Sequence, residues 1–316
     1  MMLSARGIVA EWEAATGHLP RLEIAGAAIL WAAPWRDDPA VQADKDIPLV
    51  DRRLAGTFVC APFGPDDLDD GPSHGLSANA PWHVTRASPC ALSATRRIAR
   101  GRITARIALR DDHPILYQTH ILDLDQPCTF AHHPIVQTRA GAELFSNATT
   151  MLTFDAEAPF LPQATRSDPI HDIPVGPHED FATLVGAHDL GWTAIARRAE
   201  GDTIVTLRQT CQLPVTNLWF SSESRSGIWQ AAAGLIGVED AICAGDEGFA
   251  AALSDNRIAA EGVATALSVG RHVIPHAILR VPGRVPITDV SLAPGALHLH
   301  TRTGPLTIPF DETHFT

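Results

Sequence analysis

Alternation of apolar and polar residues is the dominant pattern of this chain, and it predicts strands rather than helices. Between residues 96 and 110, apolar side chains alternate with Arg and Thr, and the alternation breaks near Gly101. A period of two with one break is typical of two half-buried antiparallel strands joined by a turn. No helical period is sustained over more than about two turns. Two short strands are expected within 21–33 and four or five within 261–310. Single strands or apolar strand-like runs are expected at 54–60, 82–86, 115–122, 128–138, 151–154, 192–198, 203–213, 215–221 and 235–244.

Three segments depart from this pattern. Residues 34–53 are polar and rich in Pro, and we expect a loop there. Residues 155–190 are irregular, with Pro, Asp, His and Gly throughout, which predicts a long excursion of the kind that is often functional. Residues 247–253 are compatible with one or two helical turns.

Many short strands separated by turn residues favour an all-β fold, a large two-sheet antiparallel β-sandwich. The chain has 316 residues, 45% of them hydrophobic, which is enough for a core of that size. No linker rich in Gly, Ser or Pro divides it and no repeat of fixed period appears, so residues 1–316 are expected to form a single domain. Two smaller β domains are the alternative.

Charge and cysteine content narrow the classes of function. The formal net charge of −12 argues against nucleic-acid binding and against an anionic membrane surface. The longest apolar run, 24–34, is too short to span a bilayer, and charges in the first 17 residues argue against a signal peptide. The five cysteines have no CxxC spacing, which disfavours a disulfide framework or a thiolate zinc site. We expect a cytoplasmic protein, monomeric or homodimeric.

Motifs for cofactors and metals are missing from the sequence. It contains no GxSxG elbow, no phosphate-binding GxxxxGK loop, no GxGxxG and no HExxH. We therefore expect no cofactor and no tightly bound metal. His298 and His300 would point to one face of a strand, as metal ligands do, but no further ligand follows at a suitable spacing. An exposed or edge strand is the simpler interpretation of this pair.

A histidine after a polar loop is the first candidate for chemistry. His74-Gly75 follows the Asp-, Gly- and Pro-rich residues 65–72 and precedes Pro81-Trp82. This arrangement predicts a histidine at a loop-to-strand junction, where functional residues concentrate. A hydrogen-bonded structural histidine is the alternative.

Two further sites combine ionisable residues with strand patterns. His132 and His133 precede Pro134, and because adjacent strand residues point to opposite faces, only one of them can face a given pocket. The proline indicates an edge or the end of a strand. Glu239 lies within the apolar run 235–244; burial there would raise the pKa of its carboxyl toward the range of a general base. Alternatively, Glu239 faces solvent and only the alternate residues are buried.

The ordered set of His74-Gly75, a mid-chain His-Pro and a later Glu resembles the aldose 1-epimerase family, also called galactose mutarotase-like proteins, over about residues 20–310. The resemblance implies a supersandwich fold and a small-molecule carbohydrate as substrate. It also implies that His74 contacts the sugar ring, that His133 is the general acid with His132 as fallback, and that Glu239 is the general base. The chain looks like a divergent member.

Three departures from the family pattern bear on the substrate. Residues 78–79 are Ala-Asn where the family usually has an Arg, residues 134–136 are Pro-Ile-Val in place of an aromatic pair, and residues 240–241 are Asp-Ala in place of Thr-Gln. The missing Arg, and the presence of a single lysine, disfavour sugar phosphates as preferred ligands.

The expected activity is interconversion of sugar anomers by acid–base ring opening, with one imidazole and one carboxylate. A non-catalytic carbohydrate-binding protein is an alternative, and so is a glycoside hydrolase or lyase with Asp189 as the second carboxylate. We expect His74, His133 and Glu239 to meet on a concave surface of the larger sheet. The residues expected to bind substrate are His74, Asn79, Trp82, His132 and Asp189.

Overall fold

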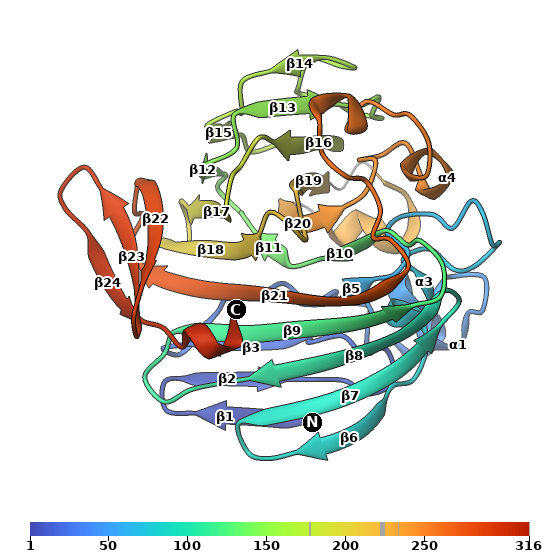
Figure 1. The fold of residues 1–316 in the computed structure, drawn as a ribbon, viewed down its shortest axis with the longest axis horizontal. Coiled ribbons are helices and arrows are strands. Elements are labelled where there is room, and N and C mark those ends of the chain that lie inside the picture. Colours follow the sequence, from blue (N-terminus) through green and yellow to red (C-terminus); the bar gives the residue numbers. More distant parts are fainter. Residues whose placement is uncertain (177, 222–224, 233, 316) are drawn as a thin grey trace.

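Two large antiparallel sheets make up most of the molecule (Figure 1). The computed structural model describes residues 1–176, 178–221, 225–232 and 234–315. Within these ranges one sheet has nine strands, in the order β15 (Asp172–Ile173), β12 (Ala142–Ser146), β17 (Leu190–Arg197), β18 (Asp202–Gln209), β21 (Gly270–Pro282), β9 (Ile115–Leu124), β8 (Gly101–Ala108), β7 (Ala91–Ile98) and β6 (His83–Ala87).

The second sheet is the one that carries the site described below. In the described part of the chain it has eight strands. Seven follow the order β14 (Arg166–Ser167), β13 (Thr150–Thr153), β16 (Asp180–Val185), β19 (Val215–Ser221), β20 (Leu235–Ile242), β10 (Phe130–His132) and β5 (Val59–Cys60), and β11 (Ile135–Gln137) also pairs with β20. The prediction of a two-sheet antiparallel sandwich is confirmed.

Smaller elements cover the ends and faces of the two sheets. One small sheet is formed by β1 (Met2–Ala5), β2 (Ile8–Glu11), β3 (Arg21–Ile24) and β4 (Ala27–Ala28), and another by β22 (Ile287–Ala293), β23 (Ala296–Thr301) and β24 (Leu306–Pro309). The short helices are α1 (Pro39–Ala43), α2 (Leu49–Arg52), α3 (Gly75–Asn79), α4 (Phe249–Ala252), η1 (Gly227–Ala231), η2 (Ala259–Glu261) and η3 (Glu312–His314). Helices α1, α3 and α4 gather at one end of the molecule, on the right in Figure 1, opposite the sheet β22–β24. None of the described helices is long and apolar enough to cross a bilayer.

Most predicted strands are present, and two segments differ from their predictions. The alternating segment 96–110 is the β7–β8 hairpin, in which Ile98 pairs with Gly101. Residues 34–53 are not only loop, because α1 and α2 lie there. Residues 155–190 contain β16, which pairs with both β13 and β19 inside the eight-stranded sheet. Its alternation was hidden because both of its faces are mostly buried, so apolar residues occur in succession.

Strand β20 is buried on both faces. Ile236, Val238 and Ile242 belong to the core between the two large sheets. Leu235 and Ala241 belong to a second core on the opposite face. Because strand side chains alternate, neighbouring residues of β20 lie in different layers. Glu239 and Asp240 therefore point into opposite sides of the sheet.

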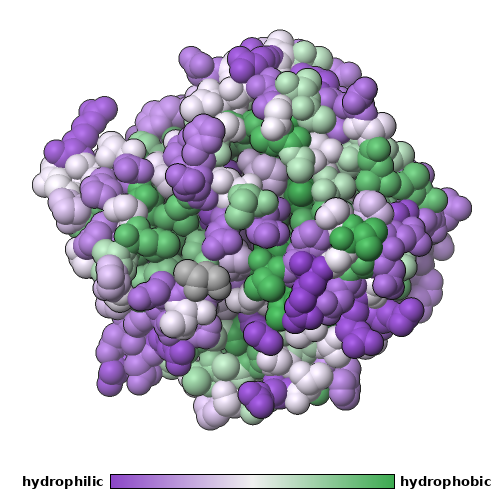
Figure 2. Space-filling view, viewed as in Figure 1, coloured by the Kyte–Doolittle hydropathy of each residue, from purple (hydrophilic) through white to green (hydrophobic). Residues whose placement is uncertain are grey.

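The nine-stranded sheet is covered on its other side by β22–β24. Trp192, Leu207 and Leu279 pack there with Leu297 and Leu299 of β23. The surface of the molecule in this view is mixed: hydrophilic side chains predominate, with apolar patches between them (Figure 2). That residues 1–316 form one domain stays a prediction.

Candidate active site

The register of the eight-stranded sheet brings His133 to Glu239. On one side of His133, Ala131 of β10 pairs with Ala241 of β20; on the other, Ile135 of β11 pairs with Gly237. Counting inward from both pairs places His133 opposite Glu239, at the spacing of a cross-strand pair. The same count places His132 opposite Asp240, on the other face of the sheet.

Pro134 is the reason that β10 and β11 are separate strands. It has no N–H to give to the ladder. Its carbonyl still accepts a hydrogen bond from Val238 N at 3.0 Å, and His133 N donates to Phe58 O at 2.9 Å. At this interruption His133 stays beside β20, while its backbone N–H bonds to Phe58, the residue that precedes β5.

His133 and Glu239 form a buried polar pair. The distance between His133 Nε2 and Glu239 Oε1 is 2.9 Å, and the two side chains are 6% and 2% exposed. His133 Nδ1 and Glu239 Oε2 are buried, and no residue in the described ranges hydrogen bonds to either atom. Buried polar atoms are rarely left without partners, so an unsatisfied carboxylate oxygen beside an imidazole is a mark of function.

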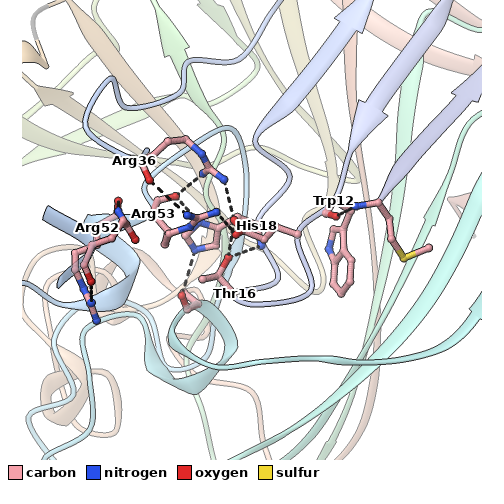
Figure 3. A network of polar contacts seen from close by, with 10 residues as sticks. Trp12, Thr16, His18, Arg36, Arg52 and Arg53 are labelled. Atoms are coloured by element: carbon pink, nitrogen blue, oxygen red, sulfur yellow. Dashed lines mark hydrogen bonds and ion pairs between the residues drawn. The ribbon is translucent and has the colours of Figure 1, made fainter. Parts of the chain in front are cut away.

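His133 packs against a stack of two further rings, Phe58 and His18. Phe58 stacks on His133 with ring centroids 4.6 Å apart, and His18 stacks on the other side of Phe58, also at 4.6 Å. The ring nitrogens of His18 contact Arg53 O at 3.1 Å and Ala78 O at 3.2 Å. Figure 3 shows the polar contacts around His18, Arg36 and Arg53. Glu13 pairs with the guanidinium groups of Arg36 and Arg53. The wall of the site is therefore anchored to Arg53, which directly follows α2, and to α3.

His74 lies at the start of α3, not at the loop-to-strand junction that the sequence predicted. Its backbone is left-handed, with φ of 62°, a conformation that is uncommon outside glycine and is found at functional sites. Gly75 follows with φ of +67°, and a Cβ there would lie 2.0 Å from Ala61 O. The close packing of this Gly against the loop at Ala61 explains why the His is followed by glycine.

His74 is a neutral hydrogen-bond donor. Its Nδ1 accepts a hydrogen bond from Gly64 N at 3.3 Å, which leaves the ring proton on Nε2. Burial, together with the nearby imidazoles of His133 and His18, lowers the pKa of His74 to about 3. The ring lies edge-on to that of His133, with centroids 5.4 Å apart.

A cavity of about 310 Å³ joins these three side chains. It lies on the face of the eight-stranded sheet that points away from the nine-stranded sheet, beside α2 and the segments that precede α3 and α4. His74, His133 and Glu239 thus converge as expected, but on the smaller of the two large sheets. The lining residues that matter below are Asp51, Phe58, Phe63, His74, His133, Trp219, Arg225, Trp229, Glu239, Cys243 and Asp246.

His132 does not share the cavity with its neighbour. Its ring stacks on His276 of β21 with centroids 4.1 Å apart, and it is fully buried between the two large sheets. Burial, with the nearby His276 and His120, lowers the pKa of His132 well below its ordinary value. Its place in the core makes it a structural residue and removes it as the fallback for His133.

Asn79, Trp82 and Asp189 also lie outside the cavity. The Asn79 side chain accepts from Val50 N and donates to two carbonyls around α3, so it holds α2 and α3 together. Trp82 is buried against Trp12 and donates to Ser77 O. Asp189 is exposed on the turn before β17 and does not line this cavity. None of the three residues is among those that line the cavity.

The pair His298 and His300 lies on β23, far along the chain from the cavity residues. His298 Nδ1 is 3.0 Å from Thr307 Oγ1, and His300 Nε2 is 2.8 Å from Ser291 Oγ. Among the described residues no group of three or more His, Cys, Asp or Glu side chains is placed to hold a metal ion.

Several cavity residues were missed by the sequence analysis. Asp51 and Phe58 come from segments expected to be a loop and a plain strand, and Trp219 from an apolar strand. Asp246 carried a weak signal, since it follows Gly245 directly after the apolar run. Nothing local to Asp51 could have pointed to the site, because it reaches the cavity only through the packing of α2.

A second polar cluster lies directly behind the site, between the two large sheets. Asp240 accepts from Thr216 Oγ1 at 2.6 Å and Arg208 Nη1 at 3.0 Å, and contacts His276 Nε2 at 2.9 Å. Asp240 and Arg208 are fully buried. Burial opposes ionisation of Asp240, but Arg208 and His276 together hold its pKa below the ordinary value. This cluster ties β20 to β18, β19 and β21.

Comparison with solved structures agrees with the architecture. No protein-family model and no curated protein matches the sequence. A candidate aldose 1-epimerase from Escherichia coli K12 superposes with a TM-score of 0.63 at 14% identity, over 89% of this chain and 98% of that one. A candidate mutarotase from Salmonella typhimurium gives 0.64 at 12% identity, over 89% and 90%.

A third structure extends the likeness to an animal protein. An aldose epimerase homologue from C. elegans gives a TM-score of 0.59 at 14% identity, over 90% of this chain and 98% of that one. Each of the three matches covers most of both chains, so the likeness includes both large sheets rather than one motif. The chain therefore has the fold of the aldose 1-epimerases and galactose mutarotase-like proteins, at low sequence identity to the structures compared.

Proposed function

We propose that the protein is an aldose 1-epimerase-like enzyme that interconverts the anomers of a sugar by acid–base ring opening. The observation that carries the proposal is the buried contact of 2.9 Å between His133 Nε2 and Glu239 Oε1, at a cavity that His74 also lines. The shared fold supports the proposal but does not decide it, because one fold can host many activities.

The reaction needs two proton transfers on one small molecule. A base removes the proton from the anomeric hydroxyl oxygen O1 while an acid protonates the ring oxygen O5. The C1–O5 bond breaks and the aldehyde forms. Rotation about C1–C2 and closure by the reverse steps then yield the other anomer. General acid and base groups of this kind contribute roughly 10²- to 10⁴-fold each to the rate.

His133 and Glu239 match these two tasks when they form an ion pair. As an imidazolium, His133 gives a proton to O5 and becomes neutral; the Glu239 carboxylate takes one from O1 and also becomes neutral. The net charge of the pair is zero before and after ring opening, so no charge is left uncompensated in a buried site. Glu239 Oε2, which is free of partners among the described residues, is the oxygen available to accept the proton.

His74 has a different role in this scheme. With a pKa lowered to about 3 it is neutral near pH 7 and cannot serve as the acid. Its Nε2–H is instead a fixed donor for a sugar oxygen. The left-handed backbone at His74 and the hydrogen bond from Gly64 N hold the ring in place, which favours orientation of the ligand over proton transfer.

Aromatic rings supply the apolar wall of the cavity. Trp219 and Trp229 both line it, with ring centroids 6.0 Å apart. Sugars present one face of C–H groups, and indole rings commonly cover such a face while polar groups fix the hydroxyls. The cavity volume is at the lower end for ligand sites, which suits a single sugar unit rather than a chain.

The test compares anomer exchange by NMR for the wild type and Glu239→Gln. The glutamine keeps the shape but cannot take up a proton at pH 7, so the exchange rate of glucose or galactose should fall by about 10²- to 10⁴-fold. The matched control is Glu143→Gln, on β12 in the nine-stranded sheet, which should keep the full rate. Thermal melts of all three proteins separate loss of catalysis from loss of folding.

Two outcomes would contradict the proposal. If the wild type leaves the spontaneous exchange unchanged while still binding sugar, the protein is a binding module on this fold. A well-folded Glu239→Gln variant with full activity removes Glu239 as the base.

A further inference from the structure

Two carboxylates in the cavity wall have no task in the chemistry above. Asp51 is on α2, and Asp246 follows β20 after Gly245. In the described ranges neither side chain makes a hydrogen bond or an ion pair; Asp51 is half-buried and Asp246 is exposed. Together with Glu239 they give the cavity three carboxyl groups, one from α2, one from β20 and one from the turn that follows β20.

The one arginine among the described lining residues is already engaged. Arg225 Nη2 is 2.8 Å from Glu179 Oε1, and its guanidinium lies over the Trp229 ring at 4.9 Å and the Trp219 ring at 5.8 Å. Glu179 Oε1 also accepts from Trp219 Nε1 at 3.2 Å. The positive charge thus lies against the two tryptophans of the wall and is balanced by a carboxylate of the protein itself.

The balance of charge around a ligand is therefore negative. In the proposed ion pair His133 offsets the charge of Glu239, and Glu179 offsets that of Arg225. Asp51 and Asp246 are then the uncompensated charges among the described lining residues, and His74 is neutral near pH 7. A phosphate or carboxylate on the ligand would meet like charges at close range in a partly enclosed site, where electrostatic repulsion is stronger than in bulk solvent. Recognition of such groups usually rests on free Arg or Lys side chains, and the described residues that line the cavity include none.

We infer that the cavity accepts aldoses without negative charge, amino sugars included, and excludes sugar phosphates and uronates, and that Asp51 and Asp246 set this selectivity. The inference rests on the proposed function in taking the ligand to be an aldose. It goes beyond that function by naming the class of aldose. Neutral sugars satisfy both carboxylates through their hydroxyl donors, and a 2-amino sugar adds an ammonium group that the carboxylates attract.

Titration of the two carboxyls agrees with this arrangement. Burial raises the pKa of Asp51 to about 6, although Arg225 and His133 oppose the rise. Burial and the nearby Glu239 raise the pKa of Asp246 to about 6. Both groups are therefore mainly ionised at pH 7.5, which is the condition for the selectivity.

The experiment measures affinity for four sugars at pH 7.5: glucose, glucosamine, glucuronate and glucose 6-phosphate. The proteins are the wild type, Asp51→Asn, Asp246→Asn, the double variant, and Asp189→Asn as a control on an exposed turn outside the cavity. Titration calorimetry gives each Kd, and NMR anomer exchange is recorded on the same samples. Thermal melts confirm that each variant is folded.

The wild type should bind glucuronate and glucose 6-phosphate at least about tenfold more weakly than glucose, and glucosamine as tightly as glucose or more so. The double variant should reduce the glucose-to-glucuronate preference by about tenfold, each single variant should reduce it in part, and Asp189→Asn should leave it unchanged. Glucuronate is the cleaner probe, because its single charge is constant over the pH range of interest.

Equal or tighter binding of glucuronate or glucose 6-phosphate by the wild type overturns the inference, and so does a preference that survives in the double variant. No binding of any of the four sugars also overturns it. Affinity is measured without turnover, so the two proposals fail separately. A protein that does not accelerate anomer exchange but binds the four sugars in the expected order refutes the proposed activity and supports the selectivity. A protein that accelerates exchange but prefers glucuronate supports the activity and refutes the selectivity.

Discussion

Acid should unfold this protein because three histidines are buried without charge. His18 and His132 are fully buried and His120 is 3% exposed. Burial is the main cause that lowers the pKa of His18 to about 4 and that of His120 to about 3, and it lowers that of His132 as well. The perturbation is a shift from pH 7.5 to pH 5.0, which protonates histidines in the unfolded chain but not these three in the folded protein.

The sign and size of the effect follow from proton linkage. Below an unfolded pKa of about 6.5, the unfolded state binds more protons than the folded state, so the free energy of unfolding falls as the pH falls. Between pH 7.5 and 5.0 each buried histidine contributes a loss of about 2 kcal/mol, or about 6 kcal/mol for the three.

Carboxyls with raised pKa values act in the opposite direction. Asp51 has a pKa of about 6 in the folded state, so on acidification it takes up a proton there before it does so in the unfolded chain. This raises the free energy of unfolding by about 1 kcal/mol between pH 7.5 and 5.0. Asp246 has the same sign but a smaller effect, because it is more exposed. His74, whose pKa is lowered to about 3 although it is only half-buried, adds a loss of the same sign of up to about 2 kcal/mol. The net loss is therefore about 4 to 6 kcal/mol, a large part of the stability of an ordinary domain.

Urea unfolding followed by tryptophan fluorescence at the two pH values measures this loss. His132→Asn should reduce the pH dependence by about 2 kcal/mol, since one titrating group is removed. His83→Asn, at an exposed position of β6, should leave it unchanged. A free energy of unfolding that differs by less than about 1 kcal/mol between pH 7.5 and 5.0 would refute the reasoning, as would imidazole NMR titrations of these histidines near pH 6.5.

Three further results are expected. Asp240→Ala should lower the free energy of unfolding by about 3 to 5 kcal/mol in urea titrations, because it leaves the buried Arg208 charge unpaired; a loss below about 1 kcal/mol contradicts this role. Gly237→Ala places a Cβ 2.8 Å from Glu239 Oε1, so the anomer exchange rate should fall while the melting temperature changes little; an unchanged rate argues against the His133–Glu239 pair as the site. His74→Asn keeps a residue that tolerates the left-handed backbone but removes the ring, and kcat/KM should fall by roughly tenfold or more with little change in the melt.

The sequence by itself determined most of the strands and the two-sheet arrangement of this protein. Alternation of apolar and polar side chains at 96–110 is sufficient to predict the β7–β8 hairpin, because a strand with one face in the core must show a period of two. The same rule requires Glu239 and Asp240 to lie on opposite faces of β20. It could not say which of the two faced a cavity, because β20 is buried on both sides.

The sheet register decided which histidine joins Glu239. His132 and His133 are equivalent candidates in the sequence, and the interruption at Pro134 hides where pairing with β20 resumes. Only the pairs on either side of Pro134 place His133 opposite Glu239 and send His132 into the core against His276. Register depends on hydrogen bonds between segments about a hundred residues apart in the chain, and no local pattern records it.

Packing of the short helices decided the rest of the site. Asp51 on α2 and His74 at the start of α3 reach the same cavity because Asn79 joins the two helices through Val50 N and the carbonyls of Ser73 and Gly75. Helices of four or five residues show no period of their own, so their existence and position follow from the loops that they close. The charge of the cavity wall is therefore a property of the tertiary structure, since it depends on which carboxylates those loops bring together.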